Sequence, residues 1–247
     1  MRNVGIIGNG FVGSAIASGF ILHANVRIYD TDERRATHTF EEVINESEFI
    51  FVSVPTPMNI GHGGEIDLSI LDQVLQQIEE INQRTDNIII VKSTAVPGTT
   101  LKYIQRHPNL NIVFNPEFLT ERTARLDFIN TSRIVIGAED DELSQRVLEL
   151  YRDRFTATQI IQTDTQSAEF IKYMCNCFFS VKVSFMNEMH QMSNLKDLNW
   201  QSIMVGFLSD GRIGNSHTDV PGHDGSLGYG GKCFPKDING FIKYYED

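Results

Sequence analysis

The chain has 247 residues and a formal net charge of −11, with 21 Lys and Arg against 32 Asp and Glu. Hydrophobic residues make up 41% and charged residues 21% of the chain, a globular composition that excludes a disordered or fibrous protein. The acidic balance argues against nucleic acid, or an anionic membrane, as the main partner.

Three features of the sequence indicate the cellular compartment: the apolar runs, the N-terminus and the cysteines. No apolar run approaches the roughly 20 residues that span a bilayer, and the opening MRNVGIIGNG has no signal-peptide pattern. Three cysteines, Cys175, Cys177 and Cys233, are too few and too unevenly spaced for a disulfide framework or a zinc site. We therefore expect a cytoplasmic protein with free thiols and no metal ion.

The first two thirds of the chain alternate short runs of Val, Ile and Phe with amphipathic segments. The runs predict strands at residues 3–8, 25–29, 49–54, 87–91, 111–114, 133–136 and 159–162. The amphipathic segments predict helices at residues 12–22, 68–82, 99–106 and 140–155. Near-continuous apolar strands are typical of a parallel sheet with both faces covered. We predict an α/β fold for residues 1–164, with a Rossmann-type, doubly wound, mostly parallel sheet.

The pattern changes near residue 165. Residues 166–195 contain no Gly or Pro and place apolar residues at helical spacing, which predicts one helix of roughly eight turns. A second helix is predicted at residues 200–208 and a last one at 233–245. Residues 210–231 hold seven glycines and predict a long loop. Residues 165–247 are therefore expected to form a helical segment that carries the loop before Cys233.

A glycine motif follows the first predicted strand and opens the first predicted helix. Its sequence is GNGFVG, and an acidic residue ends the second strand 22 positions after the first glycine. This spacing is typical of a dinucleotide site, in which the helix N-terminus faces the pyrophosphate and the carboxylate binds the ribose. A carboxylate there favours NAD over NADP. The residues assigned to the cofactor are Gly8, Gly10, Phe11, Val12, Gly13 and Asp30.

Two further segments follow later strands. VPTP begins at Val54 and STAVPGTT begins at Ser93. Ligands of open α/β sheets bind beyond the carboxyl ends of the strands, so both segments are expected to border the cofactor. Turn and helix-cap chemistry would account equally well for their Pro, Ser and Thr residues. The residues assigned to the cofactor here are Val54, Pro55, Thr56, Ser93 and Thr94.

Seven motifs occur in the order in which one enzyme family carries them. They are GNGFVG at Gly8, VPTP at Val54, STAVPGTT at Ser93, NPEFLTE at Asn115, AEFIKYMCN at Ala168, DGRIG at Asp210 and GYGGKCFPKD at Gly228. On these residues the chain resembles the UDP-glucose/GDP-mannose dehydrogenase family. The resemblance implies oxidation of the C6 alcohol of a nucleotide sugar to a carboxylate, with two NAD reduced per turnover.

By this resemblance Cys233 is the nucleophile, which forms a thiohemiacetal and then a thioester with the substrate. Its position before a helix with Pro235 near the first turn, and with Lys232 and Lys236 nearby, should also favour the thiolate. Cys175 and Cys177 lie in the long apolar helix, where buried structural cysteines are expected.

The resemblance assigns the remaining roles. Lys172 and Asn176 stabilise oxyanions, and Asp237 activates water with Lys172. Glu121 is the acid/base for thioester hydrolysis, assisted by Glu117 and Thr94, although a carboxylate at a helix start also suits the helix dipole. Glu121 and Lys236 are further assigned to the cofactor. The residues assigned to substrate are Glu117, Phe118, Leu119, Lys172, Asn176, Arg212, Tyr229, Gly230 and Gly231. The cations Lys172, Arg212, Lys232 and Lys236 are expected to form a basic pocket for the anionic substrate.

The chain departs from the family pattern in length and in detail. It stops ten residues after Asp237, before the C-terminal domain that binds the nucleotide in typical members. The segment between Asp30 and Phe49 is short, Arg122 replaces a usual glycine, and Lys232 replaces a small residue. We expect a compact UDP-glucose-type 6-dehydrogenase whose substrate is a nucleotide sugar.

Two alternatives stay open. One is a β-hydroxyacid-type dehydrogenase with a single hydride transfer, which needs a lysine but no cysteine. The other is a non-catalytic NAD-binding subunit that requires a partner chain. An exposed apolar stripe on the helix at residues 166–195 would favour a homodimer.

Overall fold

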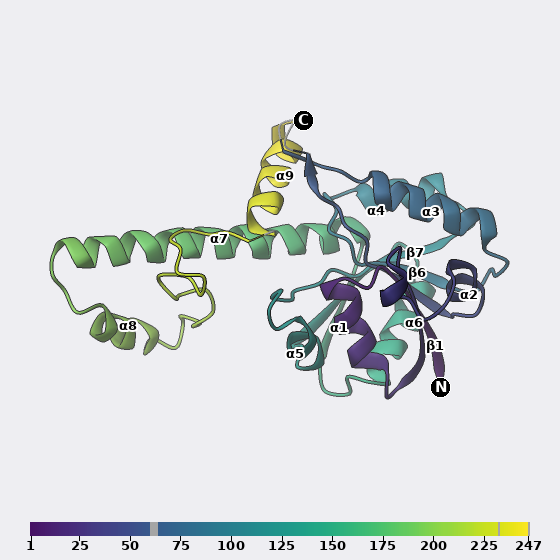
Figure 1. Ribbon diagram of the computed structural model, residues 1–247, viewed down its shortest axis with the longest axis horizontal. Coiled ribbons are helices and arrows are strands. Elements are labelled where there is room, and N and C mark those ends of the chain that lie inside the picture. Colours follow the sequence, from purple (N-terminus) through teal and green to yellow (C-terminus); the bar gives the residue numbers. More distant parts are fainter. Residues whose placement is uncertain (60–63, 232, 247) are drawn as a thin grey trace. The chain divides into compact units, whose positions relative to one another are not determined.

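The computed structural model describes residues 1–59, 64–231 and 233–246 of the chain. The chain divides into two compact units, Met1–Lys172 and Tyr173–Asp247. Figure 1 follows the chain from the purple N-terminus to the yellow C-terminus.

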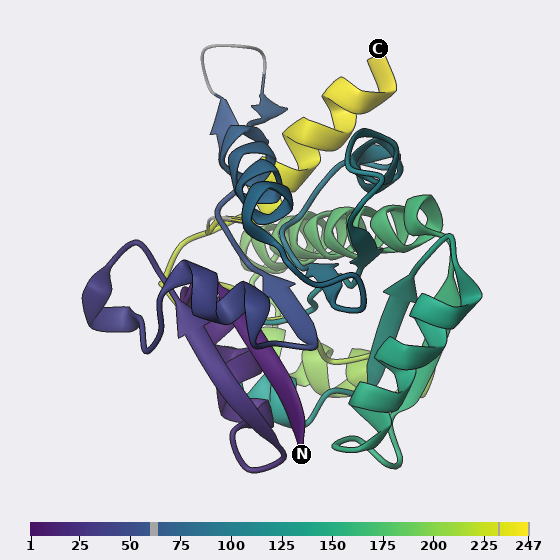
Figure 2. The same ribbon diagram turned by 90° about the vertical axis from the view of Figure 1, so that its right-hand side faces the viewer.

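The first unit is built on a seven-stranded sheet with the order β2-β1-β3-β6-β7-β8-β9. The strands are β1 (Arg2–Ile7), β2 (Ala24–Tyr29), β3 (Phe49–Val52), β6 (Ile88–Val91), β7 (Asn111–Phe114), β8 (Arg133–Gly137) and β9 (Gln159–Thr163). All neighbours are parallel except β7 and β8, which pair antiparallel through Phe114 and Gly137. Figure 2 shows β1 and β2, both purple, side by side. The prediction of a Rossmann-type, mostly parallel sheet is confirmed.

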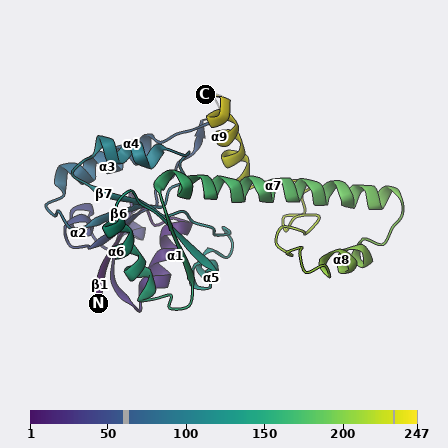
Figure 3. The same cartoon turned by 180° about the vertical axis from the view of Figure 1, so that it is seen from behind.

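Helices cover both faces of this sheet. They are α1 (Phe11–Phe20), α2 (Phe40–Asn45), α3 (Ser69–Ile81), α4 (Thr99–Arg106), α5 (Ala124–Ile129) and α6 (Asp141–Arg152). One apolar cluster joins the sheet to α1, α5 and α6, and a second joins it to α2, α3 and α4. Figure 3 shows α3 and α4 on one side of the sheet and α1, α5 and α6 on the other. The burial of the strands on both faces explains their continuous Val, Ile and Phe runs.

Several short elements were not predicted from the sequence. These are α2, α5, the 3₁₀ turn Glu33–Arg35 and the hairpin of β4 (Met58–Asn59) and β5 (Glu65–Ile66). The start of α2 carries a signal that was available, because Thr39 and Glu42 form a capping box. The others are too short for hydrophobic periodicity to distinguish them from loops.

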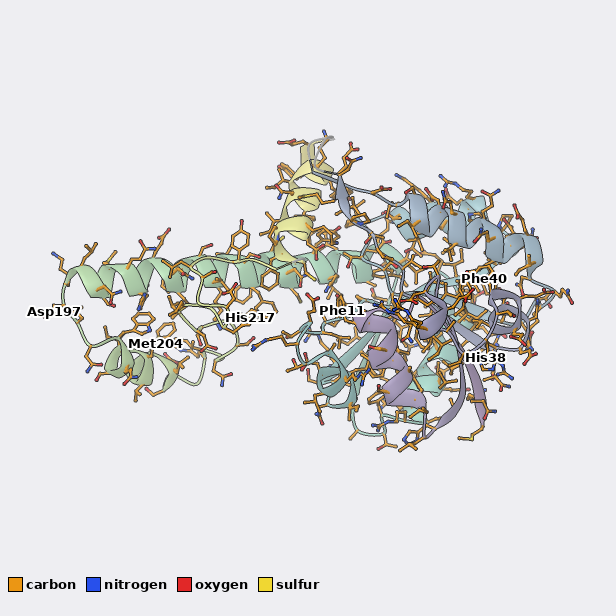
Figure 4. All side chains as sticks on the ribbon, viewed as in Figure 1. Phe11, His38, Phe40, Asp197, Met204 and His217 are labelled. Atoms are coloured by element: carbon orange, nitrogen blue, oxygen red, sulfur yellow. The ribbon has the colours of Figure 1, made fainter. Side chains whose placement is uncertain are left out.

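The second unit consists of helices around a long loop. Helix α7 (Thr165–Leu195) begins in the first unit, and α8 (Trp200–Leu208) and α9 (Phe234–Glu246) follow it. Tyr173 of α7 stacks on Phe241 of α9 with ring centroids 5.4 Å apart. The loop between α8 and α9 packs on α7 through His217, which is labelled in Figure 4. The His217 ring stacks on that of Phe179, with ring centroids 4.2 Å apart.

Part of the apolar surface of α7 is not covered within the chain. Met174, Phe178, Val181, Phe185 and Met192 are exposed. The prediction that Cys175 and Cys177 are buried is wrong, since both are partly exposed. Apolar spacing identified the helix but could not tell which of its residues would be covered. Among the described helices none combines the length and apolarity that a membrane span requires.

Candidate functional site

The glycine motif forms the turn between β1 and α1. Gly8 has a φ of 90°, and a Cβ there would lie 2.7 Å from the Ser53 carbonyl oxygen, so no side chain fits. A Cβ on Gly13 would lie 2.0 Å from the carbonyl oxygen of Gly8, which explains the third glycine by close packing. Figure 4 shows Phe11 at the start of α1.

The N-terminus of α1 fits an anionic ligand. Gly10 is its N-cap, no side chain caps the helix, and a Cβ on Gly10 would have no heavy atom within 4 Å. The N-terminus of α1 therefore has an uncapped first turn with room beside Gly10, as a pyrophosphate requires. The buried Oδ1 of Asn9 has no hydrogen-bond partner among the described residues, so it offers an acceptor to a bound group.

Asp30 lies at the end of β2, beside this turn. Its carboxylate accepts hydrogen bonds from the backbone amide of Asn9, at 2.6 Å, and from that of Asp32, at 2.9 Å. These contacts fix the acid relative to the glycine turn, at the place where a dinucleotide's ribose would lie. The residues predicted to hold NAD therefore fit a dinucleotide, with the negative charge of Asp30 opposing a 2′-phosphate.

The two segments after β3 and β6 are joined to each other. The hydroxyl of Ser93 donates to the carbonyl of Val54 at 2.7 Å, and that of Thr56 donates to the carbonyl of Thr94 at 2.9 Å. The prediction that both segments border one site is consistent with this pairing. Contact with the cofactor by Val54, Pro55, Thr56, Ser93 and Thr94 stays a prediction.

A buried ion pair joins the loop after β7 to α7. Lys172 Nζ lies 2.7 Å from Glu117 Oε1, and both residues are more than 90% buried. Burial alone would raise the pKa of Glu117, but the Lys172 ammonium and the hydrogen bond from the Leu119 amide together hold it below its usual value. The Lys172 ammonium also lies 5.8 Å from the centre of the Phe118 ring. A charged Lys172 suits the predicted stabilisation of an oxyanion.

Lys92 is a buried lysine that the sequence analysis missed. It follows β6 directly, and its Nζ donates to Asn115 Oδ1 at 2.9 Å and to the Pro116 carbonyl at 3.1 Å. Burial lowers the pKa of Lys92 to about 7. The sequence pattern that could have predicted this burial is the run IIIVK, in which a lysine directly follows a central, fully buried strand and cannot easily reach water.

Glu169 is a second buried group that the sequence analysis missed. Its carboxylate accepts from the amides of Gly98 and Thr100, at 2.6 and 2.8 Å, and from the Thr100 hydroxyl at 2.6 Å. These contacts attach α7 to the N-terminus of α4, one turn before Lys172. Burial raises the pKa of Glu169 to about 7, although its donors favour the charged form.

We expect Glu169 to make the stability of the fold depend on pH. The folded protein holds the Glu169 proton up to about pH 7, whereas the unfolded chain loses it near the usual pKa of about 4.3. The free energy of unfolding therefore falls as pH rises through this window, by about 3 kcal/mol from this group. Denaturant titrations between pH 4.5 and 7 should show a flatter dependence for Glu169→Gln than for the unchanged chain. The exposed Glu80→Gln serves as the control, and equal slopes in all three proteins would contradict the prediction.

The second unit brings Asn176 and Asp237 together. Asn176 Nδ2 donates to Asp237 Oδ2 at 2.5 Å, and Asp237 is almost completely buried. The amide of Asp237 donates to the carbonyl of Cys233 at 2.8 Å, so the carboxylate lies one helical turn after the cysteine. Cys233 is partly buried just before α9. Burial and the nearby Asp237 charge raise the pKa of Cys177, which makes its thiol less reactive.

Each cation of the predicted basic pocket that the structure describes is paired with a carboxylate. Lys172 pairs with Glu117, Lys236 with Asp237 at 2.5 Å, and Arg212 with Asp210 at 2.5 Å. Lys232 lies outside the described residues. Any anion that these cations bind would have to compete with the carboxylates or share the cations with them.

The remaining predicted site residues lie on loops. Glu121 is exposed on the turn before α5, unlike the buried Glu117. Tyr229, Gly230 and Gly231 are exposed in the loop before Cys233. This loop is held to α7 by a hydrogen bond from the amide of Gly228 to Asn187 Oδ1, at 2.9 Å. The role of Glu121 in catalysis and cofactor binding stays a prediction, as does contact with substrate by Tyr229, Gly230, Gly231, Phe118 and Leu119.

Two family models match the chain. The NAD binding domain of the UDP-glucose/GDP-mannose dehydrogenase family matches residues 22–155, and the central domain of that family matches residues 166–247. The UDP-glucose 6-dehydrogenase YwqF of Bacillus subtilis is 31% identical over 83% of this chain and 46% of its own length. That of Rickettsia conorii is 31% identical over 96% of this chain and 61% of its own length.

A solved structure agrees with these matches. The UDP-glucose dehydrogenase of Pyrobaculum islandicum is 26% identical, with a TM-score of 0.83 over 100% of this chain and 64% of its own. The chain thus spans about half to two thirds of the length of these relatives. With its NAD-binding domain and its central domain both matched, the chain belongs to the UDP-glucose/GDP-mannose dehydrogenase family.

Proposed function

We propose that the protein is an NAD-dependent nucleotide-sugar 6-dehydrogenase that converts UDP-glucose to the uronate in two oxidations. The observation that carries the proposal is the arrangement in the second unit, where Asn176 of α7 donates to Asp237, which lies one helical turn after Cys233. A catalytic cysteine has a purpose only if the aldehyde is oxidised further through a covalent intermediate.

In this proposal the glycine turn and Asp30 would hold NAD, which would supply the hydride acceptor for each oxidation. The first oxidation turns the C6 alcohol into an aldehyde and releases a proton. The Cys233 thiolate then attacks the aldehyde carbon and forms a C–S bond, giving a thiohemiacetal. Lys172 and Asn176, four residues apart on α7, stabilise the negative charge on the oxygen.

The second oxidation leaves a thioester on Cys233. Asp237 takes a proton from a water molecule, which attacks the thioester carbon and breaks the C–S bond. The products are the carboxylate and the regenerated thiolate. Overall, one alcohol, one water and two NAD⁺ give one carboxylate, two NADH and three protons.

The stoichiometry tests this proposal. We expect the purified chain to yield two NADH per uronate with UDP-glucose, in a panel of UDP- and GDP-hexoses followed at 340 nm. One NADH per molecule, with a hydroxy acid as substrate, would indicate the single-step β-hydroxyacid alternative instead. Normal NAD binding with no NADH from any sugar would overturn the proposal and favour a binding subunit that needs a partner chain.

A further inference from the structure

Lys92 is a buried ionisable group that the proposed reaction does not use. Only 5% of it is exposed, and it lies at the carboxyl end of the central strand β6, directly before Ser93 and Thr94. A lysine in such a place must be held by specific partners, because burial without them is strongly unfavourable. Its partners are the two residues that precede Glu117.

The contacts of Lys92 fix the start of the loop that carries Glu117. Its Nζ donates to Asn115 Oδ1, at 2.9 Å, and to the Pro116 carbonyl, at 3.1 Å. Both polar atoms of the Asn115 side chain have further partners, since its Oδ1 also accepts from the Tyr151 hydroxyl and its Nδ2 donates to the Val135 carbonyl, both at 2.5 Å. The backbone just before Glu117 is thus attached at several points to β6, α6 and β8.

The same loop carries the carboxylate that pairs with Lys172. Glu117 accepts from its own loop, at the Leu119 amide, and from Lys172 Nζ at 2.7 Å. Lys92 therefore contacts the start of this short loop, and Lys172 contacts Glu117 within the loop. The charged groups that face Lys92 are Glu117 and Lys172. The Tyr151 hydroxyl donates to Asn115 Oδ1, the same acceptor that Lys92 uses. Removing Lys92 would take away two of the contacts that hold the backbone before Glu117, the partner of Lys172.

We infer that Lys92 is a positioning residue for the dehydrogenase reaction: it holds the Asn115–Pro116 backbone so that Glu117 orients the Lys172 ammonium toward the reacting oxygen. The inference rests on the proposed function, because Lys172 must act in that reaction. Lys92 itself contacts neither substrate nor cofactor in this scheme.

The substitution Lys92→Met tests the inference, because methionine is apolar and of similar length but donates no hydrogen bond. We expect kcat to fall by about 100-fold, as misplacement of a catalytic group by about 1 Å can do. The KM for the sugar and the affinity for NAD should change by less than about threefold, because the substitution leaves the groups that bind the sugar and NAD in place. The exposed Lys102→Met on α4 is the matched control and should leave all three values unchanged.

A double-mutant cycle shows whether Lys92 acts through Glu117. Lys92→Met should lower kcat far less in a Glu117→Gln background than in the unchanged chain, because the Glu117–Lys172 ion pair through which Lys92 acts is already lost. Lys92→Gln, which keeps two N–H donors, should retain more activity than Lys92→Met and covers the case in which the methionine variant does not fold. Circular dichroism establishes folding for each variant.

The outcomes separate this inference from the proposed function. Equal kcat in Lys92→Met and the unchanged, active chain would overturn the inference, as would fully additive effects in the cycle. An unchanged chain that makes no NADH with any nucleotide sugar would instead overturn the proposed function.

Discussion

Replacing Cys233 with serine should stop the proposed uronate formation and leave NAD binding unchanged. The thiolate is the proposed site of the C–S bond, and serine at neutral pH is a much weaker nucleophile. We expect acid output to fall by more than about 1,000-fold, as is typical when a covalent nucleophile is removed. The NAD site should be unaffected, because its glycine turn and Asp30 lie in the other unit.

Two measurements decide this prediction. Chromatography of the products quantifies the uronate and any released aldehyde, and fluorescence titration measures NAD affinity. Cys175→Ser is the matched control, since Cys175 is also partly exposed but has no role in the proposed reaction. Unchanged acid output from Cys233→Ser would remove the thioester mechanism.

Replacing Lys172 with methionine should abolish activity and destabilise the first unit. The ion pair with Glu117 is short and buried on both sides. Removing one partner leaves an uncompensated buried charge, which costs about 3–5 kcal/mol. Loss of the proposed oxyanion donor should lower kcat by at least about 100-fold.

A second substitution separates the two effects. In Lys172→Met/Glu117→Gln the buried charge is gone, so denaturant unfolding should show most of the stability regained while the activity stays lost. The exposed pair of Arg106 and Asp72 is the control, because Arg106→Met should cost no more than about 1 kcal/mol. Activity restored in the double variant would show that Lys172 contributes to folding alone.

Local chemistry accounts for what could be predicted about the site. The turn from Gly8 to Gly13, the acid at Asp30 and the position of Cys233 before a helix all depend on residues close together in the chain. Strand and helix periodicity likewise predicted the parallel sheet and the long helix α7. The antiparallel pairing of β7 with β8 was not predictable in this way, because strand direction depends on how the connection through α5 packs.

Side-chain partners far apart in the sequence were not predictable. Lys92 and Asn115, Gly98 and Glu169, and Glu117 and Lys172 meet only because β6, α4 and α7 pack together in one unit. The pattern around Cys175 and Cys177 indicated a helix but not which of its faces would be covered.

The sequence by itself therefore determined the fold class and the nucleotide turn, because spacing along the chain dictates turns and strand ends, whereas the reactive residues stay predictions from the family resemblance. Only the tertiary structure decided which charges are buried and what holds them. Burial changes the proton affinity of Lys92, Glu117 and Glu169, and it depends on the packing of distant segments rather than on neighbours in the chain.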